Sequence, residues 1–228
     1  MILHRVWKFR LLLVALLALI VIHPLTAGQD LARLCYLTFW SFVQIATIYA
    51  ISGIRWQRHV GLALGLPLTF AMWSSYVIFK EGETFELILS GLSAAFFTAV
   101  AVMVMRHLVT NEVTADNVAG AVCAYLLLGL AIGLLYAIIE TLHAHSFHGR
   151  GELAAELADP VRRRSALTYY SFITLTTAGY GDLTPATPFT RILAAMEAVL
   201  GQLYLAILVA GLVGIRVSRR GNGGPAIR

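Results

Sequence analysis

The chain has 228 residues, of which 59% are hydrophobic and only 13% are charged, and its mean hydropathy is +0.78. Soluble domains are about 45–50% apolar and about 25% charged, so this composition excludes an ordinary water-soluble protein. The net charge of +5 does not indicate nucleic acid binding, because the basic residues cluster at the ends of apolar blocks, as membrane anchors do. The two cysteines lie in apolar segments and form neither a disulfide framework nor a metal-binding pattern.

Six apolar segments each come near the ~20 residues that cross a hydrocarbon core of ~30 Å. In chain order they cover roughly Phe9–Ala27, Leu34–Ile51, Val60–Phe79, Phe85–Met105, Asn117–Leu142 and Phe189–Ile215. Lipid offers no partner to open backbone groups, so all six are expected to be helices, with a kink at Pro67. The first segment could also be a signal peptide. A cut after Ala27 would place Leu25, which is not small, three residues before it, and this favours a retained helix.

The distribution of basic residues predicts the orientation of the chain. With the N-terminus in the cytoplasm, ten of the 17 Lys and Arg residues fall on the cytoplasmic side. An even number of spans then places both termini in the cytoplasm of a multi-pass plasma-membrane protein. The tail after Ile215 has about a dozen residues, which is too short for a ligand-binding domain of the usual size.

The stretch between the fifth and sixth segments differs from the spans. His143–Arg164 is polar, and the apolar run that follows, Ala166–Thr176, is too short to cross a membrane. Ser165 is expected to cap this run as a short helix. The glycine-containing stretch Thr177–Asp182 comes next, and irregular backbone at membrane depth is tolerated only where it is buried in protein or lines a water-filled path. The pattern therefore predicts a re-entrant helix followed by a pore-lining strand.

Such a strand suits the passage of a dehydrated cation. Backbone carbonyls from several strands around one axis can replace the water that a potassium ion gives up. Gly179 and Gly181 allow dihedral angles that residues with a Cβ disfavour. Thr177 can add its hydroxyl oxygen, and Tyr180 can point away and brace the strand against the tyrosines of the short helix. The C-terminal end of that helix carries a partial negative charge, which favours a cation.

The nine residues Thr174–Asp182 resemble the pore signature of the potassium channel family, whose filter is formed by four TVGYG loops. This sequence departs at Ala178, which stands in place of valine, so the carbonyl is kept and the packing behind it changes. The resemblance covers roughly Asn117–Arg220 and implies the order outer helix, pore helix, filter and inner helix. The chain has one such loop, so the resemblance implies assembly as a homotetramer.

The resemblance also implies roles for individual residues. Potassium ions would be bound at Thr177, Ala178, Gly179 and Tyr180, and Gly181 would complete the filter. Asp182 matches the acidic residue after the filter, and Gly201 matches the hinge glycine of the inner helix. The residues expected to support the filter from the pore helix are Tyr169 and Tyr170, which match the aromatic pair of the family, together with Thr174 and Thr176.

Two polar residues of the sixth segment are further candidates. Glu197 lies where ionisable groups are costly and are functional candidates. It could accept hydrogen bonds from Ser171 or Thr174 and hold the filter, face the cavity and attract cations, or simply pack as a neutral acid. Gln202 could line the cavity or make an inter-helix hydrogen bond. Asp182 could likewise raise the local cation concentration or be held by pore-helix partners.

The first four segments do not carry the charges of a voltage sensor. Such a sensor needs repeated arginines inside its fourth helix, and Phe85–Met105 contains neither Lys nor Arg. We therefore expect three regions: a four-helix region without sensor charges at residues 1–112, a pore domain at residues 113–220 and a short cytoplasmic tail at residues 221–228. Little intrinsic voltage dependence is expected.

The outer side carries charged residues without an assigned role. Arg162–Arg164 are expected to face lipid headgroups or to pair with Glu152, Glu156 and Asp159. A nearby cluster could sense pH, bind a metal or form a solvated loop. It consists of His143, His145 and His148, close to Glu140.

These features predict an all-α membrane protein with six transmembrane helices, a re-entrant pore helix and a filter, assembled as a tetramer like a potassium channel. The expected function is passive, potassium-selective conduction. The alternatives are a non-selective cation channel and a non-conducting membrane sensor or scaffold. Neither H-E-x-x-H nor G-x-S-x-G is present, and no enzyme is expected. The expected partners are potassium ions, the lipid bilayer and copies of the chain itself, without a cofactor, nucleic acid or soluble ligand domain.

Overall fold

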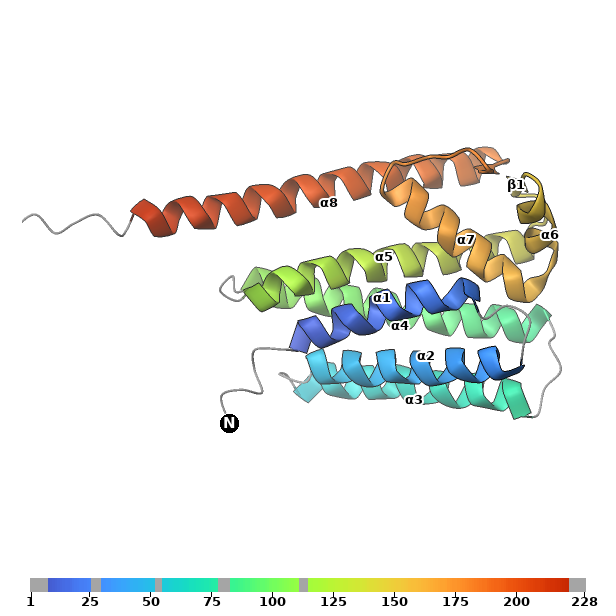
Figure 1. Cartoon of the computed structure of the whole chain (residues 1–228), viewed down its shortest axis with the longest axis horizontal. Helices are drawn as coiled ribbons and strands as arrows, with labels where there is room; N and C mark the ends of the chain where they lie inside the picture. Colours follow the sequence, from blue (N-terminus) through green and yellow to red (C-terminus); the bar gives the residue numbers. More distant parts are fainter. Residues whose placement is uncertain (1–7, 26–29, 52–54, 78–82, 111–114, 222–228) are drawn as a thin grey trace, which may run out of the picture.

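The computed structural model describes residues 8–25, 30–51, 55–77, 83–110 and 115–221. In chain order these form α1 (Lys8–Leu25), α2 (Asp30–Ile51), α3 (Arg55–Val77), α4 (Glu83–Thr110), α5 (Ala115–Leu142), β1 (Phe147–Gly149), α6 (Glu152–Ala158), α7 (Pro160–Leu175), β2 (Leu183–Pro185) and α8 (Pro188–Gly221). Figure 1 shows α1 to α5 stacked with their axes roughly aligned, and α8 lying along the far edge.

Helices occupy all six of the predicted apolar segments. Within the described residues, α4, α5 and α8 are long and apolar enough to cross a membrane, over Glu83–Leu108, Asp116–Leu142 and Pro188–Gly211. A shorter apolar stretch, Leu37–Ala50, lies in α2. These helices indicate a membrane protein, and spanning by α1, α2 and α3 stays a prediction. Helix α3 continues through Pro67.

The first five helices share an apolar core. Helix α4 packs along α5, and α1 lies against both α2 and α5. At the centre of this core are three aromatic rings. The Trp40 ring centroid is 5.2 Å from that of Phe97 and 6.1 Å from that of Phe96. Helices α1 to α4 are called the front helices below, and two of them, α1 and α4, pack directly against α5.

Helix α7 slants between α5 and α8 in Figure 1, and glycines permit its close approach to both. A Cβ at Gly133 of α5 would lie 2.6 Å from the Cα of Thr168. A Cβ at Gly201 of α8 would lie 2.0 Å from the carbonyl oxygen of Leu175. Neither distance is possible for a real side chain, so the position of α7 depends on these two glycines.

The start of α7 differs from the prediction. The helix begins at Pro160 rather than at Ala166, and Ser165 lies inside it, so the predicted cap at Ser165 is wrong. Proline suits the first turn because its missing N–H needs no partner there. The carboxylate of Asp159 instead accepts the backbone N–H of Arg162 at 3.3 Å.

A short two-stranded sheet departs from the all-helical expectation. Strand β1 pairs antiparallel with β2, with Phe147 opposite Pro185 and Gly149 opposite Leu183. Phe147 packs with Tyr136 of α5 and Tyr170 of α7, with ring centroids 5.2 Å from each. The sheet thus joins the loop after α5 to the segment that follows residues 177–182.

Candidate functional site

In the backbone after α7, the sign of the dihedral angle φ alternates from one residue to the next. We call residues 177–181 the strand after α7, although they pair with no other strand in the described part of the chain, and φ is positive at Thr177 (58°), Gly179 (52°) and Gly181 (73°). In a β-strand successive carbonyls point to opposite sides, whereas alternation of the sign of φ allows successive peptide planes to face the same side. Glycine adopts positive φ readily. A β-branched threonine does so at a cost of roughly 1–2 kcal/mol, so other contacts must hold Thr177 in place.

The last turn of α7 anchors this strand. The N–H groups of Ala178 and Gly179 both donate to the carbonyl oxygen of Ile173, at 2.8 and 3.2 Å. The N–H of Thr177 donates to the carbonyl oxygen of Thr174 at 2.9 Å. These bonds satisfy carbonyls that a helix end would otherwise leave open. The start of the strand is therefore fixed at the C-terminal end of the helix.

A hydrogen bond from α8 also reaches this strand. The side-chain nitrogen Nε2 of Gln202 donates to Oγ1 of Thr177 at 2.8 Å. Thr177 lies beyond the end of α7, so this bond joins α8 to the strand rather than to another helix, and both alternatives for Gln202 stay predictions. The bond occupies the hydroxyl that was expected to face the ion. The neighbouring Gly201 lies against Leu175, as described above. The close contact with Leu175 is by itself enough to require a glycine at position 201. The predicted hinge role of Gly201 therefore stays a prediction.

Glu197 joins three helices behind the strand. Its Oε1 accepts a hydrogen bond from Ser171 of α7 at 2.5 Å, and its Oε2 accepts one from Tyr136 of α5 at 2.7 Å. The residue is only 2% exposed. Ser171 is one of the two predicted partners, whereas Tyr136 was not predicted. Because both carboxylate oxygens bind hydroxyl groups, the contacts favour the supporting role over the cavity-facing one.

Asp182 and Tyr169 meet at the other end of the strand. The Tyr169 hydroxyl donates to Oδ2 of Asp182 at 2.5 Å, and the N–H of Leu183 donates to Oδ1 at 2.9 Å. Burial, followed by the bond to Asp182, raises the pKa of Tyr169 to about 12. The phenol therefore stays protonated as a donor near neutral pH. Of the two alternatives for Asp182, the structure contains the hydrogen bond to a residue of α7, the helix expected to be the pore helix.

The remaining predicted residues differ in their surroundings. Tyr170 is buried, and its ring lies 5.4 Å from that of Tyr136. Thr176 donates its hydroxyl to the carbonyl of Phe172 at 2.7 Å. Tyr180, which was expected to brace the strand against Tyr169 and Tyr170, is 73% exposed in the single chain.

The last turn of α5 contains a residue whose role was not predicted. The carboxylate of Glu140 accepts the backbone N–H of His145 at 2.9 Å and of Phe147 at 3.0 Å. His145 has a positive φ of 66°, so the carboxylate stabilises a tight turn into β1. Within the described residues, no group of three or more His, Cys, Asp or Glu side chains is arranged to hold a metal ion.

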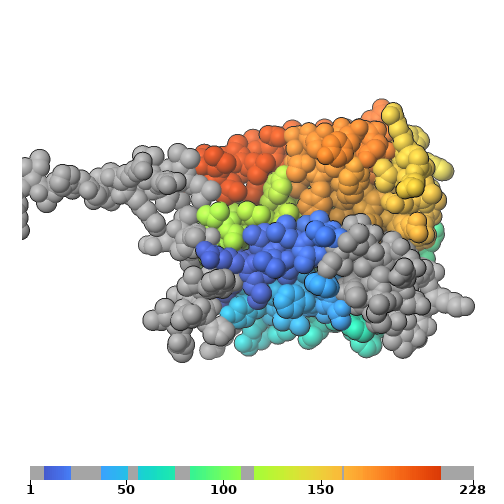
Figure 2. Space-filling view, in the orientation of Figure 1, coloured from blue at the N-terminus to red at the C-terminus, as the bar shows by residue number. Residues whose placement is uncertain are grey.

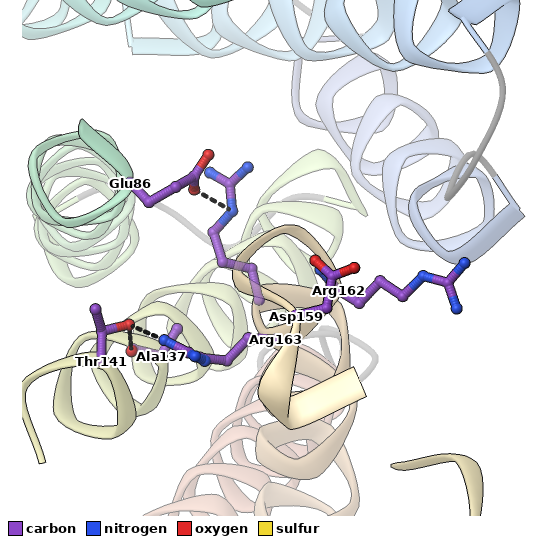
Figure 3. Close-up of polar contacts among 7 residues, drawn as sticks. Glu86, Ala137, Thr141, Asp159, Arg162 and Arg163 are labelled. Atoms are coloured by element: carbon purple, nitrogen blue, oxygen red, sulfur yellow. Dashed lines mark hydrogen bonds and ion pairs between the residues drawn. The ribbon is translucent and has the colours of Figure 1, made fainter. Parts of the chain in front are cut away.

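Arg163 is an internal brace rather than a lipid contact. Its Nε donates to the carbonyl of Leu157, and its NH1 donates to Oγ1 of Thr141, both at 2.8 Å. Figure 3 shows this side chain reaching from α7 to α5, where the hydroxyl of Thr141 in turn donates to the carbonyl of Ala137. Arg163 is 9% exposed, so the predicted contact with lipid headgroups is wrong for this residue.

Arg164 pairs with an acid that the sequence did not suggest. Its Nε lies 3.3 Å from Oε2 of Glu86 at the start of α4. The predicted partners, Glu152, Glu156 and Asp159, are therefore wrong for Arg164. The N-terminal extension of α7 explains the difference, because it turns successive arginines toward different neighbouring helices.

Two comparisons with known proteins find matches, and the family-model match lies in the C-terminal part of the chain. Residues 157–216 match a family model described as an ion channel, and they include α7, the strand after it and most of α8. Over 45 residues, or 20% of the chain, the sequence is 42% identical to two-pore potassium channel 5 of Arabidopsis thaliana. The match covers 11% of that relative's length. No solved structure matches the chain. The matches support an ion-channel family for this C-terminal part, and they point to a channel rather than to an enzyme.

Proposed function

We propose that the chain is one subunit of a potassium-selective channel and that residues 177–181 form its filter. The observation that carries this proposal is the alternating backbone, with positive φ at Thr177, Gly179 and Gly181, fixed at the end of a short helix. Several such strands around one axis would offer successive rings of carbonyl oxygens, which replace the hydration shell of a potassium ion. The resemblance of Thr174–Asp182 to the potassium channel signature and the ion-channel match support the same conclusion.

The single chain presents surfaces that suit assembly around an axis. Residues 176–180 are exposed, although ion-coordinating backbone has to be enclosed. Only 11% of the apolar window of α8 is buried, against 61% for α5. Figure 2 shows α7 and α8, coloured orange to red, along one long edge of the molecule. We infer that four copies meet at this edge, with the strands at the centre and Tyr180 covered by a neighbouring copy.

The front helices bear on how such a pore would open. Helix α4 contains Arg106 close to its C-terminal end and has no basic residue between Glu83 and Met105. Moving charge through the membrane field supplies the work of voltage gating, and the apolar part of this helix carries no arginine or lysine to move. We infer that opening is at most weakly voltage-dependent. From the distribution of basic residues we also infer that both termini lie in the cytoplasm.

Ion flux from liposomes tests the proposal. The purified chain should carry potassium down its gradient, and with potassium on one side and sodium on the other the reversal potential should lie close to the potassium equilibrium potential. Gly179→Ala should abolish selective flux, because alanine is strained at a φ of +52° although no atom lies within 4 Å of the added methyl in the single chain. Gly211→Ala, where a methyl also meets nothing within 4 Å, is the matched control.

Two outcomes would contradict the proposal. A reversal potential near zero would indicate a non-selective cation channel, and the absence of flux from correctly assembled protein would indicate a sensor or scaffold. Native mass spectrometry in detergent measures the assembly directly, and four chains per particle are expected. A monomer that still conducts would contradict the tetramer.

A further inference from the structure

A cavity of about 450 Å³ lies between the front helices and α7. This volume falls within the ~300–1,000 Å³ range of ligand pockets. Helices α1, α2, α4, α5, α6 and α7 all contribute to its wall. Most of the lining is apolar, and it includes Leu19, Ile20, Trp40, Phe97, Leu134 and Phe172. Such a surface suits a hydrocarbon chain rather than water.

The polar part of the lining carries charges of both signs. Two of these groups already have partners, since Arg164 pairs with Glu86 and Asp182 accepts the Tyr169 hydroxyl. The other two are Arg162, which is exposed, and Glu156, which is half-buried. Within the described part of the chain, no ion pair joins Arg162 to Glu156. Figure 3 shows Arg162 leaving α7 on the side opposite Arg163.

We propose that this cavity binds a diacyl phospholipid with an ethanolamine headgroup. The phosphate would accept hydrogen bonds from the Arg162 guanidinium, which matches phosphate geometry well. The ammonium would donate to the Glu156 carboxylate, and one acyl chain would lie along the apolar wall beside Trp40.

The charges of the lining select this headgroup over the common alternatives. An anionic glycerol headgroup offers Glu156 only neutral hydroxyl groups and has no positive charge to balance the carboxylate. A choline headgroup has no N–H to donate to a carboxylate. A zwitterion with a primary amine satisfies both the free arginine and the free glutamate. Because the cavity also touches Tyr169 and Asp182, the bound lipid would lie beside the end of the strand at residues 177–181.

The inference goes beyond ion conduction, and its test requires no flux. The chain contains four tryptophans, and Trp40 lines the cavity with only 4% exposure. Replacing Trp7, Trp56 and Trp73 by phenylalanine leaves Trp40 as the reporter. The full chain would be reconstituted in phosphatidylcholine vesicles containing a rising fraction of phosphatidylethanolamine with brominated acyl chains. Bromine quenches tryptophan fluorescence on contact, so saturable quenching at a low fraction is expected.

Matched variants identify the headgroup contacts. Arg162→Gln and Glu156→Gln should each raise the half-saturating fraction of brominated phosphatidylethanolamine roughly tenfold, as expected for the loss of one charge-assisted hydrogen bond. Arg150→Gln and Glu152→Gln alter exposed residues outside the cavity lining. These two variants should leave the half-saturating fraction unchanged.

A cavity-filling variant distinguishes quenching by lipid bound in the cavity from quenching by the surrounding bilayer. Ser93 is buried and lines the cavity, so Ser93→Leu should abolish the saturable quenching while the protein keeps its thermal unfolding midpoint. The proposal is overturned if quenching persists in Ser93→Leu. It is also overturned if brominated phosphatidylglycerol or phosphatidylcholine quenches as strongly as phosphatidylethanolamine, or if neither glutamine variant shifts the titration.

Discussion

Arg164 of α7 forms an ion pair with Glu86 of α4, with 3.3 Å between Nε and Oε2. Both side chains are largely buried, at 13% and 11% exposure, and the contact is an ion pair rather than an aligned hydrogen bond. It links α7, the proposed pore helix, directly to α4. The first four helices are therefore tied to the proposed pore region by a contact that involves no voltage-sensing charge.

The first prediction concerns this pair. Removing one partner leaves the other charge buried and unpaired, so Glu86→Gln and Arg164→Gln should each destabilise the protein by up to about 3 kcal/mol. Thermal unfolding in detergent measures the change. The double variant should be more stable than the sum of the two single effects predicts, because it leaves no buried charge alone. Purely additive effects would show that the two residues do not interact.

The second prediction concerns Glu197, whose carboxylate binds Ser171 and Tyr136. Glu197→Ala leaves the buried Tyr136 hydroxyl without its acceptor, at a cost of about 1–3 kcal/mol, whereas the Ser171 hydroxyl can still donate to the carbonyl oxygen of Gly129. The filter should then lose rigidity, which would be measured as faster inactivation and a smaller potassium preference in the reversal potential. Glu197→Gln keeps one acceptor oxygen and should be milder. An alanine variant with unchanged conduction would exclude a supporting role.

The helices and the positive φ at Gly179 and Gly181 could be predicted because their signals are local. Apolar length marks each helix, and Gly179 and Gly181 mark a backbone that needs positive φ. The Glu197–Ser171 contact was also predictable, because a carboxyl group inside an apolar helix needs a nearby donor. Its second partner, Tyr136, was not predictable, since that contact depends on how α5 packs against α8.

The arginines show what the sequence alone could not provide. The true start of α7 at Pro160 fixes the direction in which each arginine points. The sequence analysis placed these arginines before the helix, where their side chains have no fixed direction, so the partners Thr141 and Glu86 could not be predicted. The same applies to Glu140, whose two backbone donors come from a loop without a sequence pattern.

The third prediction concerns the hydrogen bond from Tyr169 to Asp182. The pKa of Tyr169 is raised from 10.0 to about 12, so the stability from this bond is fully present below about pH 10 and is lost as the pH rises toward 12. The thermal midpoint of the wild-type protein should fall over that interval. Tyr169→Phe should lower the midpoint at neutral pH and should lack the part of the alkaline decrease that comes from this phenol. Identical profiles for the two proteins would contradict the prediction.

The fourth prediction concerns the bond from Gln202 to Thr177, which holds a threonine at positive φ. Gln202→Leu removes the donor while keeping similar bulk, so the Thr177 hydroxyl becomes free to rotate. The lowest ion site of the proposed filter should change, and single-channel conductance should change with it. Gln202→Glu supplies an acceptor in place of the donor and should not restore the wild-type value. Wild-type conductance in Gln202→Leu would show that this bond does not shape the pore.

The last prediction separates packing from hinge motion at Gly201. A methyl group there would lie 2.0 Å from the carbonyl oxygen of Leu175, so Gly201→Ala must displace the end of α7 from α8. Overpacking of this kind costs about 1–3 kcal/mol, which exceeds the ~1 kcal/mol that alanine gains over glycine in a helix. Gly201→Ala should therefore lower the thermal midpoint, whereas Gly211→Ala, with nothing within 4 Å of the methyl, should leave it unchanged or raise it. If Gly201 acted only as a hinge, both variants would be at least as stable as the wild type, and only the opening of the pore would change at Gly201.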